Sequence, residues 1–357
     1  MRVMQVMAGG DHGGAETFFV DLVSALQRRG LEQRAVIRRN PERAEILRAA
    51  DVPLSELRFG GPLDLWTKPA LKREVQRFRP DIVQTWMVRA TKACPASPPG
   101  QAFVHVGWLG GYYKPPHFRA CDHVVGVTQD IAEHMRAAGW AEARAHYLPT
   151  FAVHEPAAPL DRADYDTPAE APLLLALGRL HAKKAFDVLL KALPAVPEAW
   201  LWIAGEGELR GELERQAAEL GVAGRVRFLG WRYDREALLA TADLCVFPSR
   251  YEPFGTVTIE AWAAGTPLVA AASAGPAGVI RDGEDALLVP IDDVEALGAA
   301  MRRLLDEPEL AQSLVAAGRR RYEAEFTEEA CARQYLAFYE SLLETPAVAG
   351  AVRGAGR

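Results

Sequence analysis

The chain has 357 residues, of which 49% are hydrophobic and 25% are charged, and its formal net charge is −6. The composition is that of a globular protein, and the length predicts about two domains. No uninterrupted apolar run reaches the roughly 18 residues of a membrane-spanning helix, and the N-terminus lacks a signal-peptide core. The cysteines are scattered without a C-x-x-C pair, so we expect reduced thiols in a cytoplasmic protein and no bound metal. They are Cys94, Cys121, Cys245 and Cys331.

The charge is unevenly distributed along the chain. Residues 1–150 hold 20 Lys and Arg against 15 Asp and Glu, a balance of +5, while the remainder holds 21 against 32, a balance of −11. The basic residues are either solvated helix faces or a surface that approaches an anionic lipid or acceptor, at the inner face of a membrane. No aromatic residues interleave with them at the spacing of a stacking platform, so we expect no nucleic-acid partner. Two groups stand out: Arg34, Arg38, Arg39 and Arg43, then Lys68, Lys72, Arg73, Arg77 and Arg79.

The first half of the chain alternates short apolar runs with amphipathic helical patterns. This βα rhythm predicts a parallel sheet covered on both faces. We expect strands at 2–7, 33–37, 81–84, 102–106 and 123–127, and helices at 15–29, 42–50, 65–78 and 129–138.

A stretch rich in Pro, Ala and Asp at 149–172 interrupts the rhythm and predicts a linker. The same rhythm then restarts and ends in three consecutive helices. We expect strands at 173–177, 200–204, 226–229, 244–247, 268–271 and 286–289. We expect helices at 185–193, 209–220, 235–240, 256–264, 294–305, 309–326 and 328–343. The fold class is therefore α/β, with two doubly wound, Rossmann-like domains facing across a cleft.

The most informative segment is Glu252-Pro-Phe-Gly255, which opens a predicted helix that contains Glu260. The first amides of a helix bind phosphate well. At about 100° per residue, the eight positions between the glutamates span slightly more than two turns, so the acids lie at different depths. They can hold two different hydroxyl-bearing groups of one ligand, which suits a nucleotide sugar.

Glycine-rich and basic turns follow other predicted strands. Arg179 and Lys184 follow the first strand of the second domain, where two cations can neutralise a diphosphate; ordinary solvated bases are the alternative. Gly230 ends a strand, where its backbone can read a nucleobase or simply make a turn. Gly13 and Gly14 open the first long helix and can offer amides to a phosphate or an acceptor, although the loop does not have the dinucleotide fingerprint.

His105 ends an apolar run at a predicted strand edge. A lone histidine there is more often a core residue than a catalyst. Tyr112, Tyr113 and Lys114 follow in a loop at the same edge, where acceptor groups can bind.

Together these residues resemble glycosyltransferase family 4, whose members have the GT-B fold. Glu252-Pro-Phe-Gly-x4-Glu260 looks like the E-x7-E element of that family, and the loops at Arg179, Gly205 and Gly230 fall in the family's order. The resemblance covers about residues 1–340 and is specific in the second domain. Two segments, 108–113 and 117–123, are similar to bacterial lipopolysaccharide-core transferases.

The resemblance implies a transfer of a hexosyl group from a nucleoside-diphosphate sugar to a glycan or glycolipid acceptor, with retention and without a cofactor. Arg179 and Lys184 would bind the diphosphate, Glu260 the ribose and Glu252 the donor sugar. His105 matches a histidine that family members place beside that sugar. Amides of the helix start would contact sugar and phosphate, namely those of Phe254, Gly255, Thr256 and Val257.

The implied organisation assigns each domain a partner. Residues 1–150 would bind the acceptor, 151–171 would form the linker and 172–326 would bind the donor. A helix at 327–345 would pack back on the first domain, and 346–357 would be a disordered tail. The chain departs from the family pattern at Ala185, where glycine is common, and at Trp262, where a small residue or Met is usual.

Other functions remain open at this stage. A nucleotide-sugar epimerase of GT-B fold would use the same donor site without an acceptor. A non-catalytic module would bind the nucleotide sugar without turnover. A dinucleotide-dependent oxidoreductase lacks its fingerprint.

Overall fold

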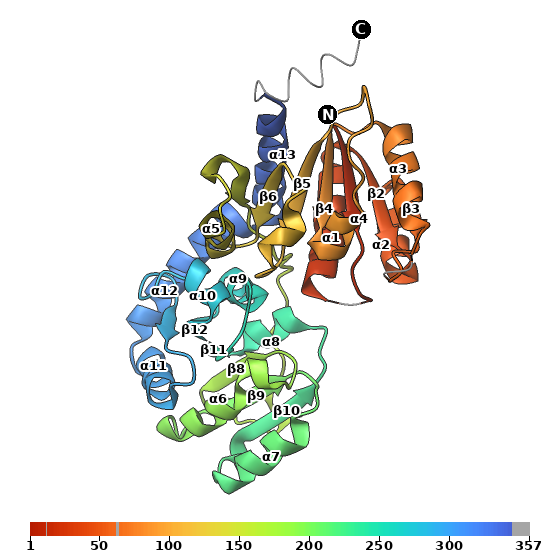
Figure 1. The fold of residues 1–357 in the computed structure, drawn as a ribbon. Helices are drawn as coiled ribbons and strands as arrows, with labels where there is room; N and C mark the ends of the chain where they lie inside the picture. The colour runs from red at the N-terminus through yellow and green to blue at the C-terminus, as the bar shows by residue number, and fades with distance from the viewer. Residues whose placement is uncertain (12, 62–63, 345–357) are drawn as a thin grey trace. The chain divides into compact units, whose positions relative to one another are not determined.

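The computed structural model describes residues 1–11, 13–61 and 64–344, and the chain divides into two compact units (Figure 1). Unit 1 comprises Met1–Thr150 and the C-terminal residues from Glu328, and unit 2 comprises Phe151–Thr327. The chain therefore passes between the units twice, after Thr150 and after Thr327. The predicted disordered tail at 346–357 lies outside the described residues.

Unit 1 is built on a seven-stranded sheet with the order β3-β2-β1-β4-β5-β6-β7, and every pair in it is parallel. Most strand residues are buried, as expected for a sheet that helices cover on both faces. The strands are β1 (Arg2–Met7), β2 (Glu32–Arg38), β3 (Leu54–Leu57), β4 (Ile82–Trp86), β5 (Val104–Leu109), β6 (His123–Gly126) and β7 (Ala145–Tyr147). The helices are α1 (Gly14–Arg28), α2 (Pro41–Ala49), α3 (Thr67–Phe78), α4 (Met87–Ala93), α5 (Gln129–Ala137) and α13 (Glu328–Glu344).

Helix α13 belongs to unit 1, although it is the last described element of the chain. The hydroxyl of Tyr339 accepts a hydrogen bond from Gln5 Nε2 at 3.1 Å and donates one to Gln84 Oε1 at 2.9 Å. The indole of Trp108 donates to the Tyr335 hydroxyl at 3.1 Å. These buried bonds connect α13 to β1, β4 and β5, and α13 also contacts α1.

Unit 2 has a six-stranded sheet with the order β10-β9-β8-β11-β12-β13, again entirely parallel. Its strands are β8 (Leu173–Leu177), β9 (Trp200–Ala204), β10 (Val226–Gly230), β11 (Leu244–Phe247), β12 (Leu268–Ala271) and β13 (Leu287–Val289). Its helices are α6 (Phe186–Ala192), α7 (Arg210–Glu219), α8 (Arg235–Thr241), α9 (Thr256–Ala264), α10 (Ala274–Val279), α11 (Val294–Asp306) and α12 (Pro308–Arg321).

The segment predicted as a linker, residues 151–171, is not a free connection. It belongs to unit 2, where the Arg162 guanidinium donates to the carbonyls of Ala169, Ala171 and Thr241 at 2.7–3.0 Å. The Trp202 indole also donates to Thr167 Oγ1 at 2.9 Å. Proline-rich composition correctly indicated that the segment has no strand or α-helix, and a short 3-10 helix at Arg162–Tyr165 is its one regular element. Composition could not show that backbone carbonyls of the segment are satisfied by this arginine.

Both sheets have a topological switch point, where the strand order reverses direction. In unit 1 it lies between β1 and β4, and in unit 2 between β8 and β11. Ligands of open parallel sheets bind beyond the carboxyl ends of the strands at such points. The loops that follow β8 and β11 are those that carry Lys184 and Glu252.

No described helix is both long enough and apolar enough to cross a bilayer. Within the part of the chain that the structure describes, none of the four cysteines is joined in a disulfide bond, and all but the half-buried Cys94 are buried.

Candidate active site

Two loops of unit 2 lie side by side because β8 and β11 pair in parallel. The backbone N–H of Arg250, after β11, donates to the carbonyl of Lys183, after β8, at 2.8 Å. The Arg250 guanidinium also donates hydrogen bonds to both carboxylate oxygens of Asp187, at 2.8 and 2.7 Å. Charge-assisted bidentate bonds of this kind hold the two loops in a defined relation.

The predicted diphosphate ligand Lys184 and the predicted sugar-facing Glu252 meet in this place. Lys184 Nζ forms an ion pair with Glu252 Oε2, and the two side chains are only 22% and 18% exposed. The ammonium also lies 5.4 Å from the centre of the Phe247 ring. The structure therefore brings together two residues that are 68 positions apart in the chain.

Arg179 supplies a second positive charge at the same turn. Its side chain is exposed, and within the described ranges it forms no ion pair. An uncommitted guanidinium beside a loop at the sheet edge is well suited to bidentate contact with a phosphate.

Helix α9 begins at this edge, immediately after Gly255. Gly255 has φ 84°, and a Cβ there would lie 2.7 Å from the Phe247 ring, so both its conformation and the space require glycine. Phe254 and Val257 are buried, while Thr256 is exposed. The phenyl and isopropyl groups therefore belong to the core, and only the backbone of these residues can meet a ligand at the helix start.

Glu260 lies on the second turn of α9, and Arg235 at the start of α8 binds it. The distance from Arg235 Nη2 to Glu260 Oε2 is 2.6 Å, with exposed fractions of 40% and 16%. Burial raises the pKa of the Glu260 carboxyl, and the Arg235 charge opposes that shift. Arg235 was not among the predicted residues, because a spacing of 25 positions across a strand leaves no local pattern.

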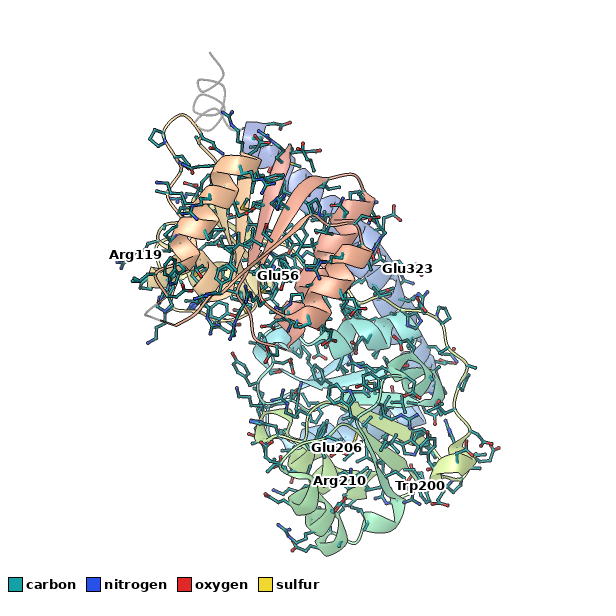
Figure 2. The ribbon with its side chains drawn as sticks, turned by 90° about the vertical axis from the view of Figure 1, so that its right-hand side faces the viewer. Glu56, Arg119, Trp200, Glu206, Arg210 and Glu323 are labelled. Atoms are coloured by element: carbon teal, nitrogen blue, oxygen red, sulfur yellow. The ribbon has the colours of Figure 1, made fainter. Side chains whose placement is uncertain are left out.

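Gly230 lies at the carboxyl end of β10, two strands from β8. It has φ 73°, and its carbonyl accepts a bond from the N–H of Gly205 at 2.8 Å. A Cβ on Gly205 would lie 1.8 Å from the carbonyl oxygen of Gly178. These glycines are needed where the loops after β8, β9 and β10 approach one another, and Figure 2 labels Glu206 and Arg210, an ion pair of 2.6 Å beside that turn.

The glycine loop of unit 1 surrounds a carboxylate of the protein itself. Gly13 precedes α1 and Gly14 begins it, and Glu16 Oε1 accepts the N–H of Gly10 at 2.7 Å. A Cβ on Gly13 would lie 2.5 Å from Glu16 Oε2. An incoming phosphate would meet this negative charge, so the arrangement favours a neutral acceptor group over an anion.

The expected position of His105 was wrong. Strand β5 runs to Leu109, so His105 is its second residue and lies four positions, about 13 Å, from the carboxyl edge. The buried ring is hydrogen-bonded through Nε2 to Thr85 Oγ1 at 2.9 Å and through Nδ1 to the Ala120 carbonyl at 3.2 Å. Burial lowers its pKa. Its catalytic role stays a prediction, and the contacts describe a residue of the core.

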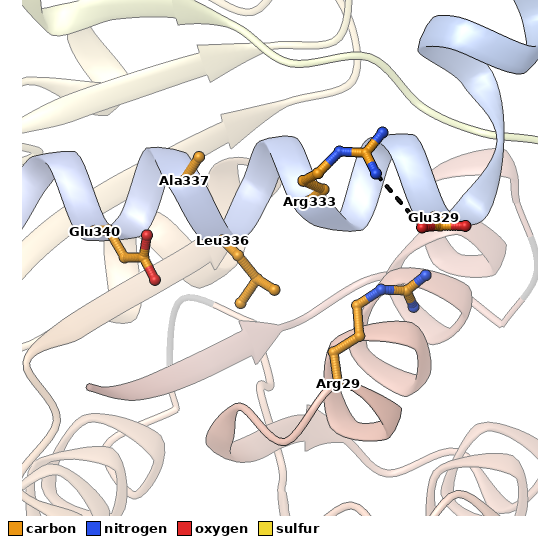
Figure 3. Close-up of a pocket in the computed structure, with 6 residues that line it drawn as sticks. All are labelled: Arg29, Glu329, Arg333, Leu336, Ala337 and Glu340. Carbon is orange, nitrogen blue, oxygen red and sulfur yellow. Dashed lines mark hydrogen bonds and ion pairs between the residues drawn. The ribbon is translucent and has the colours of Figure 1, made fainter.

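A surface hollow in unit 1 contains none of these residues. It has a volume of about 340 Å³ and is formed by one face of α13 and the end of α1 (Figure 3). It is lined by Arg29, Glu329, Arg333, Leu336, Ala337 and Glu340.

Comparison with known proteins shows the family to which the chain belongs. The family model for glycosyl transferases group 1 matches residues 158–321, and that for glycosyltransferase family 4 matches residues 12–155. The lipopolysaccharide core biosynthesis glycosyltransferase LpsE of Rhizobium meliloti (strain 1021) is 37% identical over 94% of this chain and 98% of its own length. This chain belongs to glycosyltransferase family 4. LpsD of the same organism is 36% identical to this glycosyltransferase, over 95% of the chain and 98% of LpsD.

Solved structures show that this glycosyltransferase has the predicted GT-B fold. A glycosyltransferase from Rickettsia africae superposes with a TM-score of 0.84 at 18% identity, covering 96% of this chain and 99% of that one. HepE from Anabaena, crystallised with UDP and glucose, gives a TM-score of 0.77 at 19% identity, with 96% and 100% coverage. The predictions of the family, of the fold and of an enzyme of the hexosyltransferase type are therefore confirmed.

Proposed function

We propose that this glycosyltransferase moves a hexosyl group from a nucleoside-diphosphate sugar to a glycan or glycolipid acceptor of the lipopolysaccharide-core type, with retention at the anomeric carbon. The observation that carries the donor assignment is the meeting of Lys184, Arg179, Glu252 and the start of α9 at the switch point of unit 2. The roles of LpsE and LpsD in the biosynthesis of a lipopolysaccharide core support the acceptor class.

The reaction breaks the bond between the anomeric carbon and the diphosphate oxygen, forms one to an acceptor hydroxyl oxygen, and releases the hydroxyl proton. Negative charge grows on the departing diphosphate as the sugar approaches an oxocarbenium ion. Lys184, Arg179 and the amides of the α9 start oppose that charge where it develops. Glu252 faces the donor sugar, and Glu260, held by Arg235, takes the ribose hydroxyls.

The charges at this edge suggest that no divalent metal is required. In our proposal two side-chain cations and a helix terminus take the place of a metal ion at the diphosphate. EDTA should then leave turnover unchanged, whereas a loss that added Mg²⁺ restores would contradict the proposal.

Unit 1 is proposed to take the acceptor, and the protein to act in the cytoplasm, peripherally on the inner face of the membrane. An acceptor with a lipid anchor is confined to that face, so a surface that approaches anionic lipid would bring enzyme and acceptor together.

The test is a transfer assay with a panel of UDP-, GDP- and ADP-sugars and purified lipopolysaccharide-core oligosaccharides, read by mass spectrometry. We expect one donor to extend one acceptor by a single hexose, with the anomeric configuration of the donor retained by NMR. Isomerised free sugar from donor alone would indicate an epimerase. Nucleotide-sugar binding without any product would indicate a binding module, and either result would refute the transferase reaction.

A further inference from the structure

Two large apolar side chains stand out from the surface of unit 1 at one turn. Leu65 is 80% exposed and Trp66 is 71% exposed, immediately before helix α3. Single exposed apolar residues are ordinary, but two adjacent large ones at a fixed turn indicate an interaction site. Neither residue contributes to the core or to the candidate active site.

The turn that presents this pair is held in place by Asp64. Its carboxylate accepts bonds from the backbone N–H groups of Gly60 at 2.6 Å and of Trp66 and Thr67 at 3.0 Å. The hydroxyl of Thr67 also donates to it and is the main cause of a pKa lowered to about 2. The negative charge next to Trp66 is thus engaged by these backbone groups, and Trp66 itself is one of the residues bound to Asp64.

The outward face of α3 carries only positive charge. At about 100° per residue, Lys68, Lys72, Arg73 and Arg77 fall within one half of the helix, and all four are exposed. The opposite half buries Thr67, Leu71 and Val75. The single acid of α3, Glu74, points away from this cationic face, to Ser55 Oγ at 3.0 Å and Arg34 Nη1 at 3.3 Å.

The position in the fold is also informative. Residues 58–61 and 64–66 lie between β3 and α3, and β3 ends at the carboxyl edge of the unit 1 sheet. Gly13 and Gly14, after β1, and the loop after β5 emerge at the same edge. The apolar pair therefore projects from the edge at which an open parallel sheet takes its ligand.

We propose that Leu65, Trp66 and the cationic face of α3 are the surface that docks this protein on an anionic lipid bilayer. Tryptophan is favoured at the membrane–water interface, and Lys and Arg are attracted by anionic headgroups. The combination commits the surface to a bilayer, because a soluble phosphorylated glycan would use the cations and leave Leu65 and Trp66 exposed. The inference deepens the proposed membrane-facing acceptor and does not depend on the identity of the sugar.

Vesicle binding of the whole protein tests the surface. We expect sedimentation with vesicles that contain phosphatidylglycerol, weaker binding in high salt, and little binding to pure phosphatidylcholine. Each basic residue near such a surface contributes about a five-fold gain in partitioning, so K68E/K72E should lower it at least about 25-fold. K191E/R215E, which changes the net charge equally on exposed positions of α6 and α7, should leave it unchanged.

The contribution of Leu65 and Trp66 to membrane binding is measured separately. Lipids brominated in their acyl chains should quench Trp66, so the quenching should fall in W66F and persist in W231F, where Trp231 of unit 2 is 61% exposed. L65A/W66A should weaken partitioning about ten-fold while its far-UV spectrum stays that of the parent protein.

Three results would overturn the proposed docking surface. The wild-type protein could stay in solution with anionic vesicles, K68E/K72E could bind as the parent protein does, or W66F could be quenched as strongly as the parent protein. Binding of a free phosphorylated oligosaccharide that depends on Lys68 and Lys72, without vesicle binding, would assign the cations to a glycan instead. Nucleotide affinity is measured in the same preparations, so a failure of the donor site is seen separately from a failure of docking.

Discussion

At the scale of single residues, the pairing of Lys184 with Glu252 connects charge neutralisation to the donor binding that we propose. Both side chains are largely buried, and each neutralises the other. A diphosphate that enters next to Lys184 would compete with Glu252 for the ammonium, which leaves the carboxylate to the sugar hydroxyls.

Removal of either partner should slow or stop transfer without unfolding the protein. Lys184→Ala is expected to cost about 2–4 kcal/mol of transition-state stabilisation, which is about 30- to 10³-fold in kcat. Glu252→Ala should abolish measurable turnover. Lys183→Ala is the matched control, because this neighbour is exposed and lies over the Tyr251 ring at 4.7 Å. A kcat in K184A within about ten-fold of that of the parent protein, or measurable turnover in E252A, would contradict the assigned roles.

Ala185 is one departure from the family pattern. Its side chain is buried, and its backbone lies in the left-handed region, with φ 54° and ψ 34°, directly after Lys184. That conformation costs a residue with a Cβ about 1 kcal/mol, which glycine avoids.

Ala185→Gly should therefore raise the free energy of unfolding by up to about 1 kcal/mol, partly offset by the entropy of a more flexible unfolded chain. Ala182→Gly, in the same turn but without a positive φ, should lower it by about 0.5–1 kcal/mol. Urea denaturation of both variants measures the difference. A loss of stability in A185G would refute the backbone strain that we assign to Ala185.

Most of the donor-site candidates were predictable, because the E-x7-E spacing and the loop after β8 are local patterns. Their partners were not. Arg235 reaches Glu260, and Arg250 reaches Asp187 across 63 positions, and both contacts depend on strand order. The expected position of His105 at a strand end was wrong for a related reason, since the residue that ends a strand depends on pairing and not on the end of an apolar run.

At the scale of elements, α9 and α12 pack through a large residue and a glycine. The buried Trp262 indole donates to the Asp285 carbonyl at 2.8 Å, and its ring lies against Gly318 of α12. A Cβ on Gly318 would lie 2.3 Å from Trp262 Cδ1. The tryptophan that departs from the family pattern is thus accommodated by this glycine.

Gly318→Ala should cost about 1–3 kcal/mol of stability, because the ring is held on both sides and cannot retreat. Gly211→Ala in helix α7, where the nearest atom is 3.8 Å away, should instead stabilise the protein by about 0.5–1 kcal/mol. Chemical denaturation distinguishes them, and equal effects of the two variants would contradict the packing.

A pair of histidines lies where α13 contacts the sheet of unit 1. His123 Nδ1 and His146 Nε2 are 3.0 Å apart, and the Phe338 ring of α13 lies 4.8 Å from His146. Burial lowers the pKa of both rings, that of His146 to about 4, to which His123 and Arg136 contribute.

Unit 1 should lose stability as the pH falls from about 6.5 towards 4. In that window the unfolded chain binds protons that the neutral native pair does not, so the free energy of unfolding decreases as pH falls. Because His146 is half-buried, solvent screening limits its share to about 1 kcal/mol between pH 7 and pH 5. His146→Gln should reduce the loss of unfolding free energy between pH 7 and pH 5 by that amount in urea denaturation, and an unchanged loss would refute the linkage.

The regular elements were largely predictable, and the exceptions are short. The predicted bounds of β1, β8, β9, β11, β12 and α9 agree exactly with the structure. Among the strands and α-helices of the described residues, four were not predicted: β3, α4, β7 and α10. Helix α4 starts directly after β4 at Met87, which has φ 61°, without a glycine or proline to mark the boundary. Strand β7 is three residues long and is stabilised by its pairing with β6.

At the scale of the whole molecule, two parallel sheets with the same winding are joined by two passages of the chain. The repeated βα rhythm was enough to predict this class of fold. The position of the first passage was not predictable, because residues 151–171 resemble a linker in composition and yet are bonded to unit 2.

The central claim is that the donor binds where the loops after β8 and β11 meet. Hydrogen–deuterium exchange in the presence of a saturating nucleoside diphosphate tests it. Peptides that contain residues 178–186 and 250–264 should become protected in the wild type, and K184A should show the effect only at higher nucleotide concentration. Protection confined to other segments of the chain, or unchanged exchange in these peptides under a saturating ligand, would contradict it.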